Sequence, residues 1–296
     1  MADLRPMEFG EILDGALSLF RRHFGLFFKL SLTVMWAPIA LGVYWRVRFL
    51  GLSAANPEQA AALLQGELLA FSLWALLFVL IYGAGMLVLT AGSIRIISDS
   101  YLGREPQFGE AMGFGVGKIV PLFLVGLGKS LLLVLIGILC GVAIAVTATA
   151  GKSLGPGLVI LGVFVEVAGT IWLLLYVAIG YMVTTPVVVL ETLSSSFDSF
   201  GRSWELTRGF RGRIFGLVFV GTLIANFLPQ IVLSALGGLV TELLPSAILP
   251  WTILAAALPI VLTPIVPCIL TLAYYDLRVR REGFDLQLLS EQLGTA

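Results

Sequence analysis

The chain has 296 residues, of which 58% are hydrophobic and 12% are charged, and its formal net charge is zero. A mean hydropathy of +1.01 lies far outside the range of soluble globular domains and excludes that class. The zero net charge says nothing about partners, and we expect no nucleic acid among them.

Long apolar runs recur along the whole sequence. About 20 helical residues span a hydrocarbon core of roughly 30 Å, and the period-two alternation of a barrel is missing. We therefore predict an all-α fold, an integral membrane helical bundle of about six transmembrane helices in a single membrane domain over residues 1–296. The expected spans are residues 26–45, 68–94, 119–150, 158–190, 214–240 and 250–275.

A short amphipathic segment precedes each pair of predicted spans. In residues 7–23, Phe9, Leu13 and Phe20 follow one helical stripe, while acids and arginines occupy the other side. The same order recurs at residues 107–118 and 196–210, and it begins again at Phe284. The sequence thus predicts three repeated units, each an interfacial helix followed by a helical hairpin.

Prolines predict irregular helices in the later spans. The fourth span is long enough that it must tilt, kink or protrude, and Pro186 is the obvious place for a kink. The sixth span carries Pro259, Pro264 and Pro267. Transporters use such prolines in broken helices, but plain kinks are the simpler interpretation.

Cations are distributed unevenly between the two ends of these spans. Thirteen lie on the side of the termini, whereas Arg46, Arg48 and Lys152 lie on the other. The positive-inside rule then places both termini and the surface helices in the cytoplasm. Here arginines would contact anionic headgroups of the lipid bilayer, or a soluble or membrane protein partner. The candidate contacts are Arg21, Arg22, Arg202, Arg208, Arg211, Arg213, Arg278, Arg280 and Arg281.

Three acids mark the cytoplasmic ends of the helices that return from outside: Asp99, Glu191 and Asp276. A carboxylate at a helix C-terminus opposes the helix dipole and needs compensation, for which the nearby arginines are natural partners. We interpret the three as structural acids that hold each surface helix against its span, in preference to catalytic acids.

One carboxylate lies within a span. Glu166 is eight residues into the fourth span, where a charge costs about 2.5–3.5 kcal/mol or more. Asn226 of the fifth span has a similar expected depth; Gln230 is one turn from Asn226 and Thr170 one turn from Glu166. A neutral glutamic acid that hydrogen-bonds an amide is the favoured hypothesis, and a transport site is the alternative.

Motifs of catalysis and metal binding are missing from the sequence. It has one histidine, His23, and no CxxC, HExxH, GxSxG or phosphate-binding loop. Cys140 and Cys268 both lie in apolar runs and do not indicate a disulfide framework. We expect no enzyme, no cofactor and no metal.

Three stretches carry a family resemblance: RPMEFGEILDGALSLFRRHFGLF at the start, PVVVLETLSSSFDSFGRSWELTRGFRGRIFG in the centre and LAYYDLRVRREGFDL at the end. They resemble the bacterial membrane-protein family typified by the membrane domain of glycerophosphoryl diester phosphodiesterases. The resemblance implies a bacterial cytoplasmic membrane. In fused members a separate soluble barrel with metal-binding acids and histidines hydrolyses substrate, and this chain has no segment long enough for that barrel.

Two functions remain open from the sequence. The first is a non-catalytic scaffold or accessory subunit that acts through its basic cytoplasmic face. The second is a small transporter or lipid-handling protein that uses the Glu166 region and the proline-bearing sixth helix. A cavity at Glu166 would favour the second function, and tight packing there would favour the first.

Overall fold

The computed structural model describes residues 5–53, 57–151 and 155–283, which form helices and turns and contain no strand. The all-α prediction is confirmed. Six helical stretches of the described chain are long and apolar enough to cross a membrane, so this is a multi-pass membrane protein. They are Phe24–Trp45, Phe71–Tyr101, Ile119–Thr149, Pro156–Leu190, Arg211–Leu243 and Ile248–Glu282.

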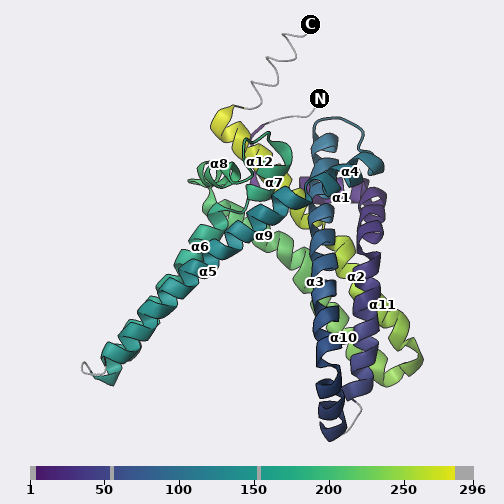
Figure 1. Ribbon diagram of the computed structural model, residues 1–296. Coiled ribbons are helices and arrows are strands. Elements are labelled where there is room, and N and C mark those ends of the chain that lie inside the picture. Colours follow the sequence, from purple (N-terminus) through teal and green to yellow (C-terminus); the bar gives the residue numbers. More distant parts are fainter. Residues whose placement is uncertain (1–4, 54–56, 152–154, 284–296) are drawn as a thin grey trace. The chain divides into compact units, whose positions relative to one another are not determined.

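Short helices alternate with these long ones (Figure 1). The short helices are α1 (Phe9–Arg22), α4 (Phe108–Gly117) and α8 (Asp198–Thr207), whose ends lie within about three residues of the predicted surface segments. The long helices between them are α2 (Phe24–Ser53), α3 (Pro57–Tyr101), α5 (Ile119–Ala150) and α6 (Pro156–Gly180). The equivalence of the three predicted repeats stays a prediction. The expected fourth surface helix at Phe284 lies outside the described residues.

The remaining elements complete the last three spans. They are α7 (Thr184–Leu190), α9 (Arg211–Thr222), the π-helical turn η2 (Leu223–Phe227), α10 (Leu228–Leu243), η3 (Pro245–Ala247), α11 (Ile248–Leu262) and α12 (Ile265–Glu282).

Helix α1 has its polar groups satisfied at its start and one face buried. The Glu8 backbone N–H donates to Oε2 of Glu11 over 2.7 Å, and Nη2 of Arg5 donates to Oε1 of Glu11 over 2.6 Å. These bonds lower the pKa of Glu11, first through Glu8 and then through Arg5. Ile12, Ala16 and Phe20 are buried, one helical turn apart. The apolar stripe thus fixes which side of α1 packs.

The contacts within the chain divide it into two compact units, and the expected single membrane domain stays a prediction. Unit 1 contains the described residues up to 119 together with 217–272, and unit 2 contains 120–216 together with 273–283. Helices α9 and α12 contribute residues to both units. Contacts within each unit are described separately below.

In unit 1, α2 packs against α3 on one side and α11 on another, and α4 lies across the end of α3 (Figure 1). Phe27, Leu30 and Met35 of α2 are fully buried, and Leu89 and Ile94 of α3 are buried as well. These side chains form the core at the α1 and α4 end of the unit.

In unit 2, α5 and α6 run side by side as a long hairpin (Figure 1). The fourth span is interrupted at residues 181–183, between α6 and α7. The interruption lies just before Pro186, which has no N–H to donate to the carbonyl of Met182. The predicted kink is therefore a break one turn ahead of the proline.

Proline also shapes the last two spans. The π-helical turn η2 ends two residues before Pro229, whose missing N–H removes a bond to the carbonyl of Ala225 within that turn. In the sixth span, α11 ends at Leu262 and α12 begins at Ile265, so the interruption falls at Pro264. Thr263 Oγ1 donates to the Pro259 carbonyl over 3.0 Å, which satisfies one acceptor beside this interruption.

Candidate functional site

The break between α6 and α7 is the place where α8 docks in unit 2. Gly180 is the last residue of α6, and its carbonyl accepts hydrogen bonds from Ser203 Oγ at 2.9 Å and Thr207 Oγ1 at 3.2 Å. The ring of Trp204 lies against Gly180 so closely that a Cβ there would come within 2.6 Å of it. Ser203 and Thr207 are four residues apart and therefore share one helical face. The central motif thus fixes α8 on the end of α6.

Arg211 holds the next turn of the chain to the same surface. Its guanidinium lies between two aromatic rings, with Cζ 3.8 Å from the centroid of Tyr176 and 4.0 Å from that of Trp204. Such stacking is strongest when water is excluded, and Nε of Arg211 is buried without a hydrogen-bond partner among the described residues. Gly209, with φ +84, provides the turn between α8 and α9. Arg211 therefore serves packing in unit 2.

Glu191 is bonded from two directions at the end of α7. Nε of Arg202 lies 3.0 Å from its Oε2, and the hydroxyl of Tyr274 donates to its Oε1 over 2.8 Å. Nη1 of Arg202 also reaches Oε1 of Glu282 at 2.5 Å, and Glu282 pairs with Nε of Arg278 at 3.0 Å. Burial alone would lower the pKa of Arg202, but hydrogen bonds to Glu282 and Glu191 outweigh it and raise that pKa.

Asp276 is the centre of a second set of ion pairs. Its side chain is 2% exposed, and its Oδ2 lies 3.3 Å from Nη2 of Arg213 and 3.0 Å from Nε of Arg280. The guanidinium groups of Arg280 and Arg281 both lie over the ring of Phe210, at 5.9 and 5.7 Å. Arg281 also donates to the carbonyl of Arg208. These contacts join the end of α12 to the start of α9.

Five of the predicted contact arginines are exposed: Arg21, Arg22, Arg208, Arg280 and Arg281. Of these five, Arg280 and Arg281 also take part in the contacts of Asp276 and Phe210 described above. Arg21 and Arg22 lie in the last turn of α1, and Arg208 follows α8. In unit 2, Arg208 borders a groove of about 290 Å³ that Glu205, Arg202 and Arg281 also line. The other predicted contact arginines take part in the ion pairs and ring contacts described above.

Asp99, the first of the three predicted structural acids, lies near the end of α3 in unit 1. Its Oδ2 is 2.8 Å from Nε of Arg95, one turn earlier on the same helix. Arg95 and Lys118 both lie over the ring of Phe114 of α4, at 5.4 and 5.6 Å. Each of the three acids is therefore ion-paired, Asp99 within its own helix and Glu191 with an arginine of α8.

Next to Asp99, Nε2 of His23 lies 2.8 Å from Oγ of Ser100. This contact connects the turn between α1 and α2 to the end of α3. Burial, followed by the charge of Arg22, lowers the pKa of His23. A neutral imidazole suits a hydrogen bond to a hydroxyl.

The intramembrane carboxylate Glu166 faces α5. Thr147 Oγ1 donates to its Oε1 over 2.6 Å, and Thr170 Oγ1 donates to its backbone carbonyl over 2.7 Å. Oε2 is buried and has no hydrogen-bond partner among the described residues. The bond across the hairpin fixes the register of α5 against α6.

Asn226 and Gln230, the proposed partners of Glu166, belong to unit 1. Asn226 is half-buried in the π-helical turn, and Gln230 is exposed in α10. Because Glu166 lies in unit 2, the pairing of these groups stays a prediction. The side chains of Arg46, Arg48 and Lys152 lie outside the described part of the structure.

Three features of this site were not predicted from the sequence: the ring contacts of Arg211, the docking position at Gly180 and the bonds of Tyr274 and Glu282. Tyr274 and Glu191 are 83 residues apart, and no local pattern predicts their contact.

Comparisons with known proteins give no relative. No family model matches this chain, and no curated protein and no solved structure matches it either.

Proposed function

We propose that this protein is a non-catalytic membrane scaffold or accessory subunit that binds a partner through the exposed arginines of its surface helices. One observation carries the proposal. The polar side chains around α8 are bonded to one another, while Arg21, Arg22 and Arg208 remain exposed. Arg208 beside the well-packed α8 of unit 2, and Arg21 and Arg22 on α1 of unit 1, are outward cations that suit binding to an acidic protein surface or to anionic headgroups.

The proposal includes the topology and the membrane. The side with the surface helices is cytoplasmic, as the asymmetry of cations in the sequence predicts. The membrane is the bacterial cytoplasmic membrane, and the chain belongs to the family that it resembles. The hydrogen bonds and ion pairs of two resembling stretches, at residues 203–209 and 274–283, give those stretches a structural purpose.

The test is a charge reversal restricted to exposed arginines. Arg21, Arg22 and Arg208 are replaced together by Glu in a strain in which loss of the protein has a phenotype. A matched variant with Lys at the same three positions keeps the charge. We expect the Glu variant to insert and to keep its thermal midpoint while it loses function and its co-purifying partner. The Lys variant should keep most of both, since screened charge and not bidentate geometry is decisive at an exposed site.

Full function of the Glu variant would overturn the proposal. Loss of function with a lowered thermal midpoint would indicate damage to folding and would equally contradict the assignment of these three arginines as outward contacts. Arg211 and Arg213 are unsuitable for this test because both have internal partners.

A second candidate function, a small transporter or lipid-handling protein, is favoured by one observation. The buried Oε2 of Glu166 has no partner within the described residues, as expected of a group that waits for a ligand or proton. Glu166→Gln separates the two functions. A scaffold should keep its activity and stability, because the amide oxygen still accepts from Thr147, whereas a transporter should lose activity.

A further inference from the structure

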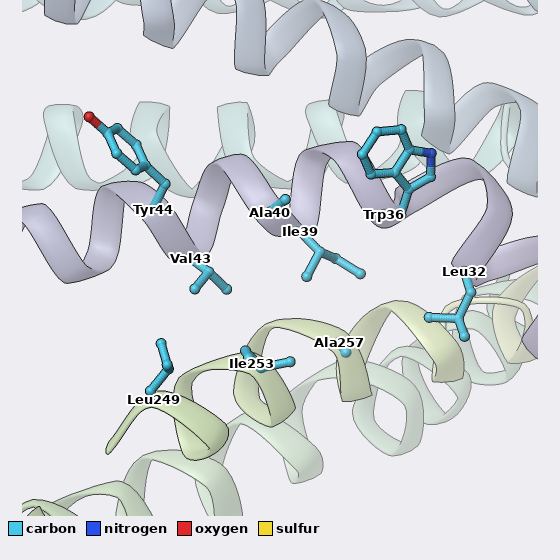
Figure 2. A pocket seen from close by; sticks show the side chains of 9 residues that line it. All are labelled: Leu32, Trp36, Ile39, Ala40, Val43, Tyr44, Leu249, Ile253 and Ala257. Atoms are coloured by element: carbon cyan, nitrogen blue, oxygen red, sulfur yellow. The ribbon is translucent and has the colours of Figure 1, made fainter. Parts of the chain in front are cut away.

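Two apolar grooves flank one stripe of α2 in unit 1. The larger has a volume of about 780 Å³ and lies between α2 and α11. In Figure 2 side chains from the two helices point toward each other across it, Leu32, Ile39 and Val43 from α2 and Leu249, Ile253 and Ala257 from α11. The smaller has a volume of about 450 Å³ and lies beside Trp74 of α3. Both grooves are lined almost wholly by apolar groups.

The two grooves share a ridge with a notch in it. Trp36, Ala40 and Tyr44 border both grooves and follow one another at intervals of four residues, so they form one stripe of α2. Trp36 is 67% exposed and Tyr44 51% exposed, and the small Ala40 lies between them. Figure 2 shows all three on the side of α2 away from Ile39 and Val43. The small side chain of Ala40 therefore leaves a passage between the two aromatic rings, from one groove to the other.

One end of the ridge has the composition of a membrane boundary. Tyr44 contacts the rings of Trp45 and Trp74 at 6.1 and 6.3 Å, and Trp45 contacts Phe71 at 5.2 Å. Tryptophan and tyrosine are enriched at the level of the lipid headgroups. From Leu32 to Tyr44 the helix rises about 18 Å, so the larger groove extends from this boundary to about the middle of the bilayer.

Size discriminates among possible occupants. A transmembrane helix is 10–12 Å wide, so 18 Å of it fills about 1,400 Å³ or more; a helix could therefore cover the mouth of the larger groove but could not lie inside it. Hydrocarbon chains are narrower, and the surrounding bilayer supplies them directly. Two neighbouring grooves that meet at an aromatic boundary match two chains joined at one headgroup.

We propose that unit 1 holds one diacyl phospholipid, with an acyl chain in each groove on either side of Ala40. The Tyr44 hydroxyl and the indole N–H groups of Trp45 and Trp74 lie at the level where ester and phosphate oxygens accept hydrogen bonds. This site is independent of the exposed arginines, and it requires neither of the functions proposed above.

The experiment measures lipid that stays bound after mild detergent extraction and extensive washing. Native mass spectrometry and phosphate analysis are applied to the intact chain and to Ala40→Trp, Ala257→Trp and Ala235→Trp. Ala40→Trp closes the passage and Ala257→Trp fills the larger groove, whereas Ala235 is an exposed residue of α10 outside both grooves. We expect one phospholipid per chain in the wild type and in Ala235→Trp, and about a fivefold loss in the other two.

A graded series guards against misfolding of the tryptophan variants. Retention should fall in the order Ala40, Ala40→Val, Ala40→Leu, with circular dichroism unchanged. Equal retention in every variant, equal loss in Ala235→Trp, or a bound lipid with a single chain would overturn the proposal. So would a dimer of the chain without lipid, because the grooves would then form a protein interface.

Discussion

A methyl group at Gly180 tests whether α8 is docked as described. In Gly180→Ala the new Cβ would lie 2.6 Å from Cε3 and Cζ3 of Trp204, a distance that carbon atoms do not tolerate. The ring has little room to retreat, because Arg211 lies 4.0 Å from its centroid and Tyr181 5.3 Å from it. The hydroxyls of Ser203 and Thr207 also hold α8 to the Gly180 carbonyl.

The expected cost follows from this geometry. Relief of the overlap requires a shift of about 1 Å in a packed ring, and overpacking of this kind costs about 1–3 kcal/mol. The sign of the change in the free energy of unfolding is informative, because a Gly→Ala substitution within a helix usually stabilises a soluble protein by about 0.5–1 kcal/mol. Gly169 of the same helix is the matched control, since a Cβ there meets nothing within 4 Å.

The assay is denaturant unfolding of both variants in the same detergent, followed by the free energy of unfolding. Gly180→Ala should lower that free energy by about 1–3 kcal/mol, and Gly169→Ala should leave it unchanged or raise it. In a Trp204→Leu background the cost at Gly180 should fall, because the two positions are coupled by contact. Equal behaviour of the two alanine variants would refute the docking of Trp204 on Gly180.

Three further predictions follow from the same contacts and from the charge pattern. Arg211→Ala should lower the free energy of unfolding by about 1–3 kcal/mol through loss of its stacking on Tyr176 and Trp204, whereas Arg208→Ala, at an exposed position, should change it by less than about 0.5 kcal/mol. In a cysteine-free background, an impermeant maleimide should label Thr241→Cys in intact cells and Ser194→Cys only after permeabilisation, and the reverse pattern would contradict the topology. The pKa of His23 is lowered by burial and then by the charge of Arg22, so the neutral imidazole's contribution to stability is complete above the unfolded pKa of about 6.5 and is lost as pH falls below that value. His23→Gln should remove this part of the pH dependence of the free energy of unfolding. A pH profile that is the same in the variant and the wild type would contradict the prediction.

The spans and the surface helices could be predicted because their signals are local. Apolar runs and helical stripes are properties of neighbouring residues, and the bounds of α1, α4 and α8 agree with the predicted segments to about three residues. The break ahead of Pro186 could be predicted for the same reason, since proline acts on the carbonyl four residues before it.

Tertiary contacts were beyond this kind of inference. Arg202 and Glu282 are 80 residues apart, and their ion pair depends on how α8 and α12 pack. The groove between α2 and α11 likewise depends on two helices that are far apart in sequence. The sequence also gave no reason to separate the residues of α9 and α12 between two compact units.

The most instructive difference concerns the arginines. By composition, Arg208, Arg211 and Arg213 form one basic cluster, and the sequence predicted the same outward role for all three. In the fold the guanidinium of Arg211 lies over two rings that are nearly perpendicular to each other, Arg213 pairs with the buried Asp276, and Arg208 is exposed.

A charge reversal of the whole cluster would therefore combine two effects. Glu at residue 213 would place a second carboxylate beside Asp276, whose side chain is 2% exposed, and like charges at a buried site are strongly destabilising. Glu at residue 211 would remove the cation from two aromatic faces that attract cations. Loss of function in such a variant would report unfolding as readily as loss of a partner. Burial and internal contacts, and not position in the sequence, determine which arginines can test the proposed docking role, and together they select Arg21, Arg22 and Arg208.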